Sequence, residues 1–101
     1  MNLRDVLAEV AVQLEAAEGT VVADGTEWTR SGRPFAFVSS DGDAEFLLDE
    51  RVAAAATRTP DTTASSRGAG WVRFSPAALD AHGIDRAAAW FQSAYRRQER
   101  A

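Results

Sequence analysis

The chain has 101 residues, of which 46% are hydrophobic and 26% charged, proportions typical of a folded domain and not of a disordered segment. A chain of this length builds one hydrophobic core, so we expect a single domain over residues 1–101. The absence of cysteine excludes disulfides, thiolate catalysis and zinc sites with sulfur ligands, and the net charge of −4 argues against general affinity for nucleic acid.

The charge is unevenly distributed along the chain. Residues 1–50 carry −8 and residues 51–101 carry +4, an asymmetry that permits head-to-tail self-association. Residues 2–5 lack the basic start of a signal peptide, and no purely apolar run is longer than residues 52–56, far fewer than the ~18 residues of a membrane span. We therefore expect a cytoplasmic protein without a membrane contact.

A first helix is predicted by apolar residues at three- and four-residue spacing. Asn2 is placed to cap this helix and Gly19 follows its end. The apolar positions form one stripe, which is expected to be buried: Leu3, Val6, Leu7, Val10 and Leu14.

From residue 20 to residue 49 the period changes to two, which predicts an antiparallel meander. Turn residues separate its expected strands, which cover residues 20–23, 26–30, 34–39 and 44–48. Alternation along the third of these strands predicts that Phe35 and Phe37 share one face.

After the meander, Asp49 can cap a short alanine-rich helix over residues 50–57. Residues 57–70 contain no large apolar side chain that could anchor them to a core. We expect this segment to be the most mobile part of the chain and a candidate lid.

The remaining residues predict a strand over 71–74, a brief helical turn that ends at Gly83, and a last helix capped by Asp85. The predicted fold class is therefore α+β, with an antiparallel β-meander sheet packed against the N- and C-terminal helices.

No arrangement of residues typical of a catalytic site is found. The single histidine, His82, precedes Gly83 in a position typical of a helix end, and no second histidine or cysteine could complete a catalytic or metal site with it. Asp41, Asp43 and Glu45 alternate like the start of a calcium loop, but glycine and glutamate do not follow at the required spacing. We predict no catalytic residues, no metal and no cofactor.

Alternation in the late strand predicts a contact surface. If Val72 and Phe74 are buried, then Trp71 and Arg73 must point to the other side of the sheet. Aromatic and arginine side chains together suit stacking against planar or anionic groups.

The same tryptophan–arginine spacing recurs in the second predicted strand, and an arginine of the 57–70 segment can border the surface. The predicted binding residues are Trp28, Arg30, Arg67, Trp71 and Arg73. The alternative is that the sheet is covered on both faces and both tryptophans belong to the core.

Short motifs also resemble known families. Residues 70–74 (GWVRF), 85–89 (DRAAA) and 93–97 (SAYRR) resemble the closing third of the bacterial luciferase-like domain family, a name that implies no established activity. Residues 32–39 (GRPFAFVS), continuing to 49, are similar to YjbR-type (MmcQ/YjbR-like) proteins, some of which carry a DNA-binding label. Histidines that luciferase-like members place in residues 36–39 and 63–67 are absent here, so the resemblance implies the fold and no histidine-based activity.

The leading hypothesis for function is a non-enzymatic binding or interaction module that uses a sheet surface and the 57–70 segment. Its partner would be another protein or, in a weak homodimer, a second copy. One alternative is a nucleic-acid-binding protein of YjbR type, and another is a small-molecule enzyme with an unrecognised site around His82 or paired carboxylates.

Overall fold

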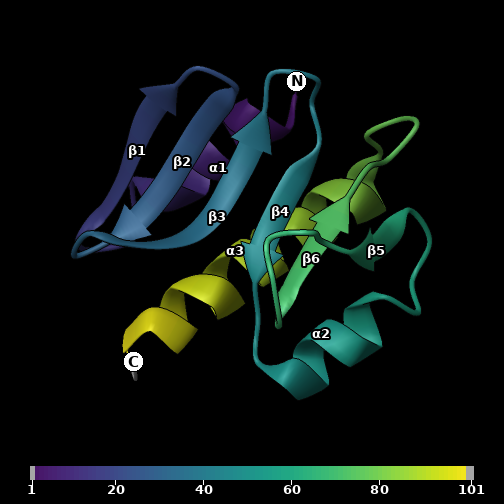
Figure 1. The fold of residues 1–101 in the computed structure, drawn as a ribbon. Coiled ribbons are helices and arrows are strands. Elements are labelled where there is room, and N and C mark those ends of the chain that lie inside the picture. Colours follow the sequence, from purple (N-terminus) through teal and green to yellow (C-terminus); the bar gives the residue numbers. More distant parts are fainter. Residues whose placement is uncertain (1, 100–101) are drawn as a thin grey trace.

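The computed structural model describes residues 2–99, and Figure 1 shows one antiparallel sheet with the first and last helices packed on one of its faces. The sheet has six strands in the order β1-β2-β3-β4-β6-β5. In chain order the elements are α1 (Leu3–Ala11), β1 (Ala17–Val22), β2 (Gly25–Arg30), β3 (Arg33–Ser39), β4 (Ala44–Leu47), α2 (Glu50–Ala56), β5 (Thr62–Ala64), β6 (Trp71–Phe74) and α3 (Ala81–Glu99). The predicted α+β class is confirmed. None of the helices in the described range is long and apolar enough to cross a membrane.

Helix α1 begins as predicted and ends early. The side chain of Asn2 accepts a hydrogen bond from the backbone N–H of Asp5 at 2.9 Å, which satisfies a free donor of the first turn. The helix stops at Ala11, well before the predicted end at Gly19. The carbonyl of Glu15 accepts a hydrogen bond from the Tyr95 hydroxyl, so contact with α3 holds the chain in a turn where the apolar spacing alone favours helix.

The core lies between the sheet and the helices α1 and α3, which are drawn behind the strands in Figure 1. Aromatic rings of the sheet meet α3 directly: the ring centroids of Phe35 and Phe91 are 5.1 Å apart, and those of Phe74 and Trp90 are 5.5 Å apart. The largest side chains that are fully buried are Phe35, Phe46, Phe74, Phe91, Leu7, Leu48 and Val72.

An irregularity between β2 and β3 reverses one predicted side-chain direction. Trp28 pairs with Ala36 while the next residue of β2 pairs with Pro34, so β3 contributes one extra residue, Phe35. Phe35 therefore turns toward α3, whereas Phe37 lies on the opposite face beneath an arginine. The prediction that Phe35 and Phe37 share a face is wrong, because a bulge interrupts strict alternation.

The segment 57–70 has more regular secondary structure than its composition predicts. It contains β5, which pairs with β6 at the edge of the sheet. Hydrogen bonds, and not apolar burial, fix this segment. The Thr59 hydroxyl donates to the carbonyl of Ala56 at 2.7 Å, and the N–H of Ser75 donates to the carbonyl of Asp61 at 2.8 Å. Residues 62–64 therefore form a strand that the composition did not predict, and the mobile lid stays a prediction.

The C-terminal helix is one element where two were predicted. Asp80 accepts a hydrogen bond from the N–H of Gly83 at 2.7 Å and so takes the capping role predicted for Asp85. Gly83 lies inside the first turn of α3, and the residues between Phe74 and Ala81 form bends without helix.

Candidate interaction surface on the open sheet face

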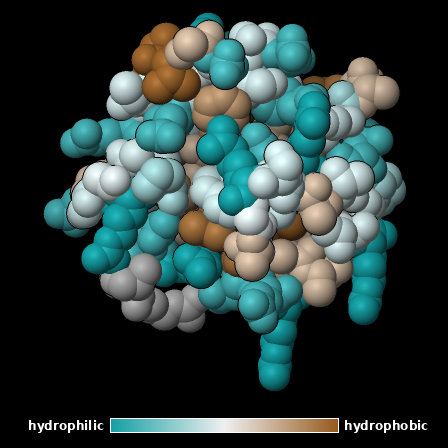
Figure 2. Space-filling view, in the orientation of Figure 1, coloured by the Kyte–Doolittle hydropathy of each residue, from teal (hydrophilic) through white to brown (hydrophobic). Residues whose placement is uncertain are grey.

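The sheet face turned away from α1 and α3 is called the open face here, and Figure 2 shows it from the same side as Figure 1. Directly paired residues of antiparallel strands point to the same side. The strand register therefore places one row of side chains across the open face, formed by Glu27, Phe37, Glu45, Arg73 and Thr63. Hydrophilic side chains dominate this view of the molecule (Figure 2).

Strand β6 follows the predicted alternation. Val72 and Phe74 are buried on the helix side, whereas Arg73 is exposed and Trp71 half-buried on the open face. Trp71 is paired with Leu47 of β4, so an aromatic and an aliphatic side chain lie side by side on this face.

Arg67 holds the segment after β5 against the open face. Its Nε donates to Glu45 Oε1 at 3.1 Å, and its guanidinium carbon lies 4.3 Å from the ring centroid of Phe37 and 5.4 Å from that of Trp71. The hydroxyl of Ser65 donates to the other carboxylate oxygen of Glu45. Arg67 thus covers Phe37, which is only 7% exposed although it lies outside the main core.

Arg73 is held by the residue just before β4. Its Nε donates to Asp43 Oδ2 at 3.1 Å, and a second nitrogen of the same guanidinium contacts that oxygen. This hydrogen bond and the negative charge of Asp43 raise the pKa of Arg73 above its ordinary value, so the side chain stays charged. Because Arg67 and Arg73 each face a carboxylate, and Glu27 adds another in the same row, the open face is not a basic patch.

Two of the residues predicted for this surface lie on the other side of the sheet. Trp28 is 7% exposed and meets Phe91 of α3 edge-on at 5.4 Å. The guanidinium of Arg30 lies 3.9 Å from the ring centroid of Tyr95, and its Nη1 donates to the Tyr95 carbonyl at 3.1 Å. The structure therefore brings together Arg67, Trp71 and Arg73 and separates Trp28 and Arg30 from them.

The spacing of Trp28 and Arg30 is the same as that of Trp71 and Arg73, and only the register of the strands distinguishes their faces. The register pairs Trp28 with buried Ala36. Ala36 in turn pairs with Phe46, and Phe46 with Val72, so all of these side chains lie on the helix side. The spacing of residues within one strand does not reveal which face of the sheet they occupy, because the face depends on the pairing with neighbouring strands.

Sequence reasoning missed the residues that complete the surface. These are Phe37, Asp43, Glu45, Leu47 and Ser65. The alternation of Asp43 and Glu45, considered above only as part of a calcium loop, was the available signal, because residues two apart on a strand share a face.

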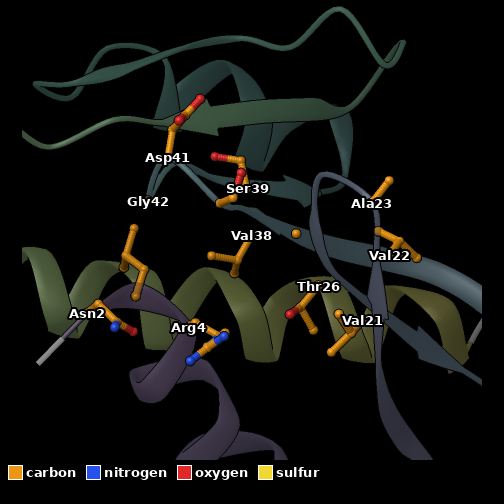
Figure 3. A pocket seen from close by; sticks show the side chains of 13 residues that line it. Asn2, Arg4, Val21, Val22, Ala23, Thr26, Val38, Ser39, Asp41 and Gly42 are labelled. Carbon is orange, nitrogen blue, oxygen red and sulfur yellow. The ribbon is translucent and has the colours of Figure 1, made fainter.

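A separate hollow of about 510 Å³ lies between the start of α1 and the tips of the β1–β2 and β3–β4 hairpins (Figure 3). Its lining mixes aliphatic side chains, such as Val21 and Val38, with polar ones, such as Arg4 and Asp41. His82 is exposed on the first turn of α3 and does not line this hollow. Within residues 2–99 no group of three or more histidine, aspartate or glutamate side chains is placed to hold a metal ion.

Comparison of the chain with protein-family models, with curated proteins and with solved structures returned no match.

Proposed function

We propose that this chain is a non-enzymatic protein-interaction module whose contact surface is the open face of the sheet together with residues 65–70. The observation that supports this most strongly is the position of Trp71, half-exposed beside Leu47, with the guanidinium of Arg67 near its ring and Arg73 two residues further along the same face of β6. Tryptophan and arginine are the residue types that most often contribute strongly to protein–protein binding.

The contacts of Arg67 support a role for the adjoining loop. If a partner drew this guanidinium away from Glu45, the ring of Phe37 would be uncovered next to Leu47 and Trp71. The apolar part of the contact surface would then be larger than in the free chain. In this proposal the lid predicted for residues 57–70 is limited to residues 65–70, and the Arg67 side chain is the part that moves.

The charges on the open face favour a protein partner over nucleic acid. Each guanidinium is already matched by a carboxylate, Arg67 by Glu45 and Arg73 by Asp43, so phosphate groups would compete with these pairs. Nucleic-acid affinity depends mainly on unmatched positive charge. The resemblance to YjbR-type proteins remains the reason to keep nucleic acid as the alternative partner class.

The proposal is tested by capture of partners with the full chain as bait, comparing Trp71→Ser/Arg73→Ser with Arg4→Ser/Arg96→Ser. The second pair removes two exposed arginines from α1 and α3, on the helix side of the sheet. We expect the open-face variant to lose captured proteins that the helix-side variant retains, with both variants folded by circular dichroism. Equal capture by both folded variants would contradict the proposal.

A further inference from the structure

Strand β1 leaves one edge of the sheet unprotected. Five of its six residues are exposed, it contains no proline, lysine or arginine, and its pairing with β2 runs without interruption. Proteins usually block such edges, because half of the backbone N–H and C=O groups point outward without a neighbouring strand. The opposite edge is formed by β5, which has only three residues and follows Pro60 closely.

Exposed apolar side chains are concentrated at this edge. Among the described residues the large hydrophobic side chains that are exposed are Val12, Val21 and Val22, and two of these lie on β1. Val21 is 81% exposed, and Figure 2 shows strongly hydrophobic atoms at the upper left, where Figure 1 draws the end of β1. An open strand edge with apolar side chains is available for pairing with another strand.

We propose that β1 pairs antiparallel with β1 of a second copy of this chain, with the two-fold axis passing between the two Thr20 residues. A two-fold axis perpendicular to the sheet keeps every side chain on its own face, so each directly opposed pair must consist of two odd-numbered or two even-numbered residues. The N–H of Ala17 is already bonded to the carbonyl of Leu14, so the free edge begins at Glu18. Pairing about Thr20 then uses the whole stretch from Glu18 to Val22.

This register makes the edge complementary to itself. On the helix side Val21 of one copy lies opposite Gly19 of the other, where the Trp28 ring crosses so closely that a Cβ on Gly19 would come within 2.7 Å of it. Val21 would therefore cover the edge of the indole ring. On the open face Thr20 faces Thr20 and Val22 lies beside the aliphatic part of Glu18, so that no like charges are directly opposed.

Acidic residues near the edge make this association weak and dependent on salt. Glu15, Glu18, Asp24 and Glu27 lie on or beside β1 in both copies. Their mutual repulsion is screened by added salt, so the dimer is expected to strengthen as ionic strength rises. A peptide from a different protein could bind the same edge without the two-fold register. Cross-linking of single-cysteine variants therefore distinguishes such a peptide from a second copy of this chain.

The chain has no native cysteine, so single cysteines report this register directly. Opposed Thr20→Cys residues would have their Cα atoms ~4.5–5.5 Å apart, within the range of a disulfide. Two Val22→Cys residues would be separated by four residues along the strands, about 13 Å, and could not be bridged. In a glutathione redox buffer we expect Thr20→Cys to form the covalent dimer at least roughly tenfold faster than Val22→Cys. Equal rates would overturn the proposal.

Sedimentation equilibrium of the unmodified chain provides the second measurement. We expect a monomer–dimer equilibrium in which Val21→Arg lowers the dimer affinity roughly tenfold. Ala64→Arg, which places the same charge on the exposed β5 edge, should leave the affinity unchanged. Monomeric behaviour at all concentrations and salt levels, or an equal response to the two variants, would overturn self-pairing; a monomer that binds a strand-forming peptide would identify the other occupant.

Discussion

The guanidinium carbon of Arg67 lies 4.3 Å from the ring centroid of Phe37, and this contact joins the loop after β5 to the open face of the sheet. The same side chain is paired with Glu45 at 3.1 Å. One arginine therefore both fixes the loop and shields the ring of Phe37.

Replacement of Arg67 by alanine should uncover Phe37 with only a small loss of stability. A partly exposed cation–π contact contributes about 0.5–1 kcal/mol and an exposed ion pair up to about 1 kcal/mol, so we expect a decrease of about 1 kcal/mol in the free energy of unfolding. Urea denaturation measures this decrease, and fluorescence of a bound hydrophobic dye should increase. Arg67→Lys is the control for charge, and dye binding equal to that of the unmodified chain in Arg67→Ala would contradict the shielding role.

Gly25 is expected to be the least replaceable glycine of the meander. Its φ is +155°, and an added Cβ would lie 2.0 Å from the backbone carbonyl oxygen of Val38, a contact that only movement of the strands could relieve. We expect Gly25→Ala to lower the unfolding free energy by more than about 2 kcal/mol.

The matched control for that change is Gly42→Ala. Gly42 has φ of +96° but open space around the position of a Cβ, so only the strained backbone contributes, about 1 kcal/mol. Chemical denaturation of both variants measures the difference, and equal costs would show that the close approach of β2 and β3 at Gly25 is unimportant.

Tyr95 should stabilise the fold through its hydroxyl as well as its ring. The hydroxyl donates to the carbonyl of Glu15 in the turn between α1 and β1. Tyr95→Phe removes this donor and should cost about 1 kcal/mol in the free energy of unfolding, because a partly buried carbonyl loses its partner. An unchanged denaturation midpoint in Tyr95→Phe would mean that the turn is held by packing alone.

Nucleic acid should not bind the open face measurably. The carboxylates of Glu45 and Asp43 already neutralise the two arginines there, and the whole chain carries −4. We expect no electrophoretic shift of DNA or RNA at low salt, where phosphate contacts are strongest. A shift that disappears with added salt and with Arg67→Ala would instead support the nucleic-acid alternative.

Much of the architecture follows from local patterns. The apolar stripe of α1, the turn pairs of the meander and the alternation of Trp71, Val72, Arg73 and Phe74 each place a structural element correctly. These signals succeed because each is decided by neighbours within a few residues along the chain.

The errors arise where distant contacts decide the structure. The bulge that turns Phe35 toward α3 depends on the pairing of β2 with β3, and the position of Trp28 depends on the register across several strands. The edge strand β5 forms although its residues have little to bury, because β6 offers an open row of hydrogen-bonding groups. None of these relationships is encoded in the spacing of residues within one segment.

Hydrogen–deuterium exchange of the chain in complex with a protein captured by it would test the open-face proposal most directly. We predict slowed exchange in the loop 65–70 and in the adjacent strands β4 and β6, with the amides of α3 unaffected. Slowed exchange confined to α1 and α3, with the 65–70 loop exchanging as in the free chain, would contradict the proposal.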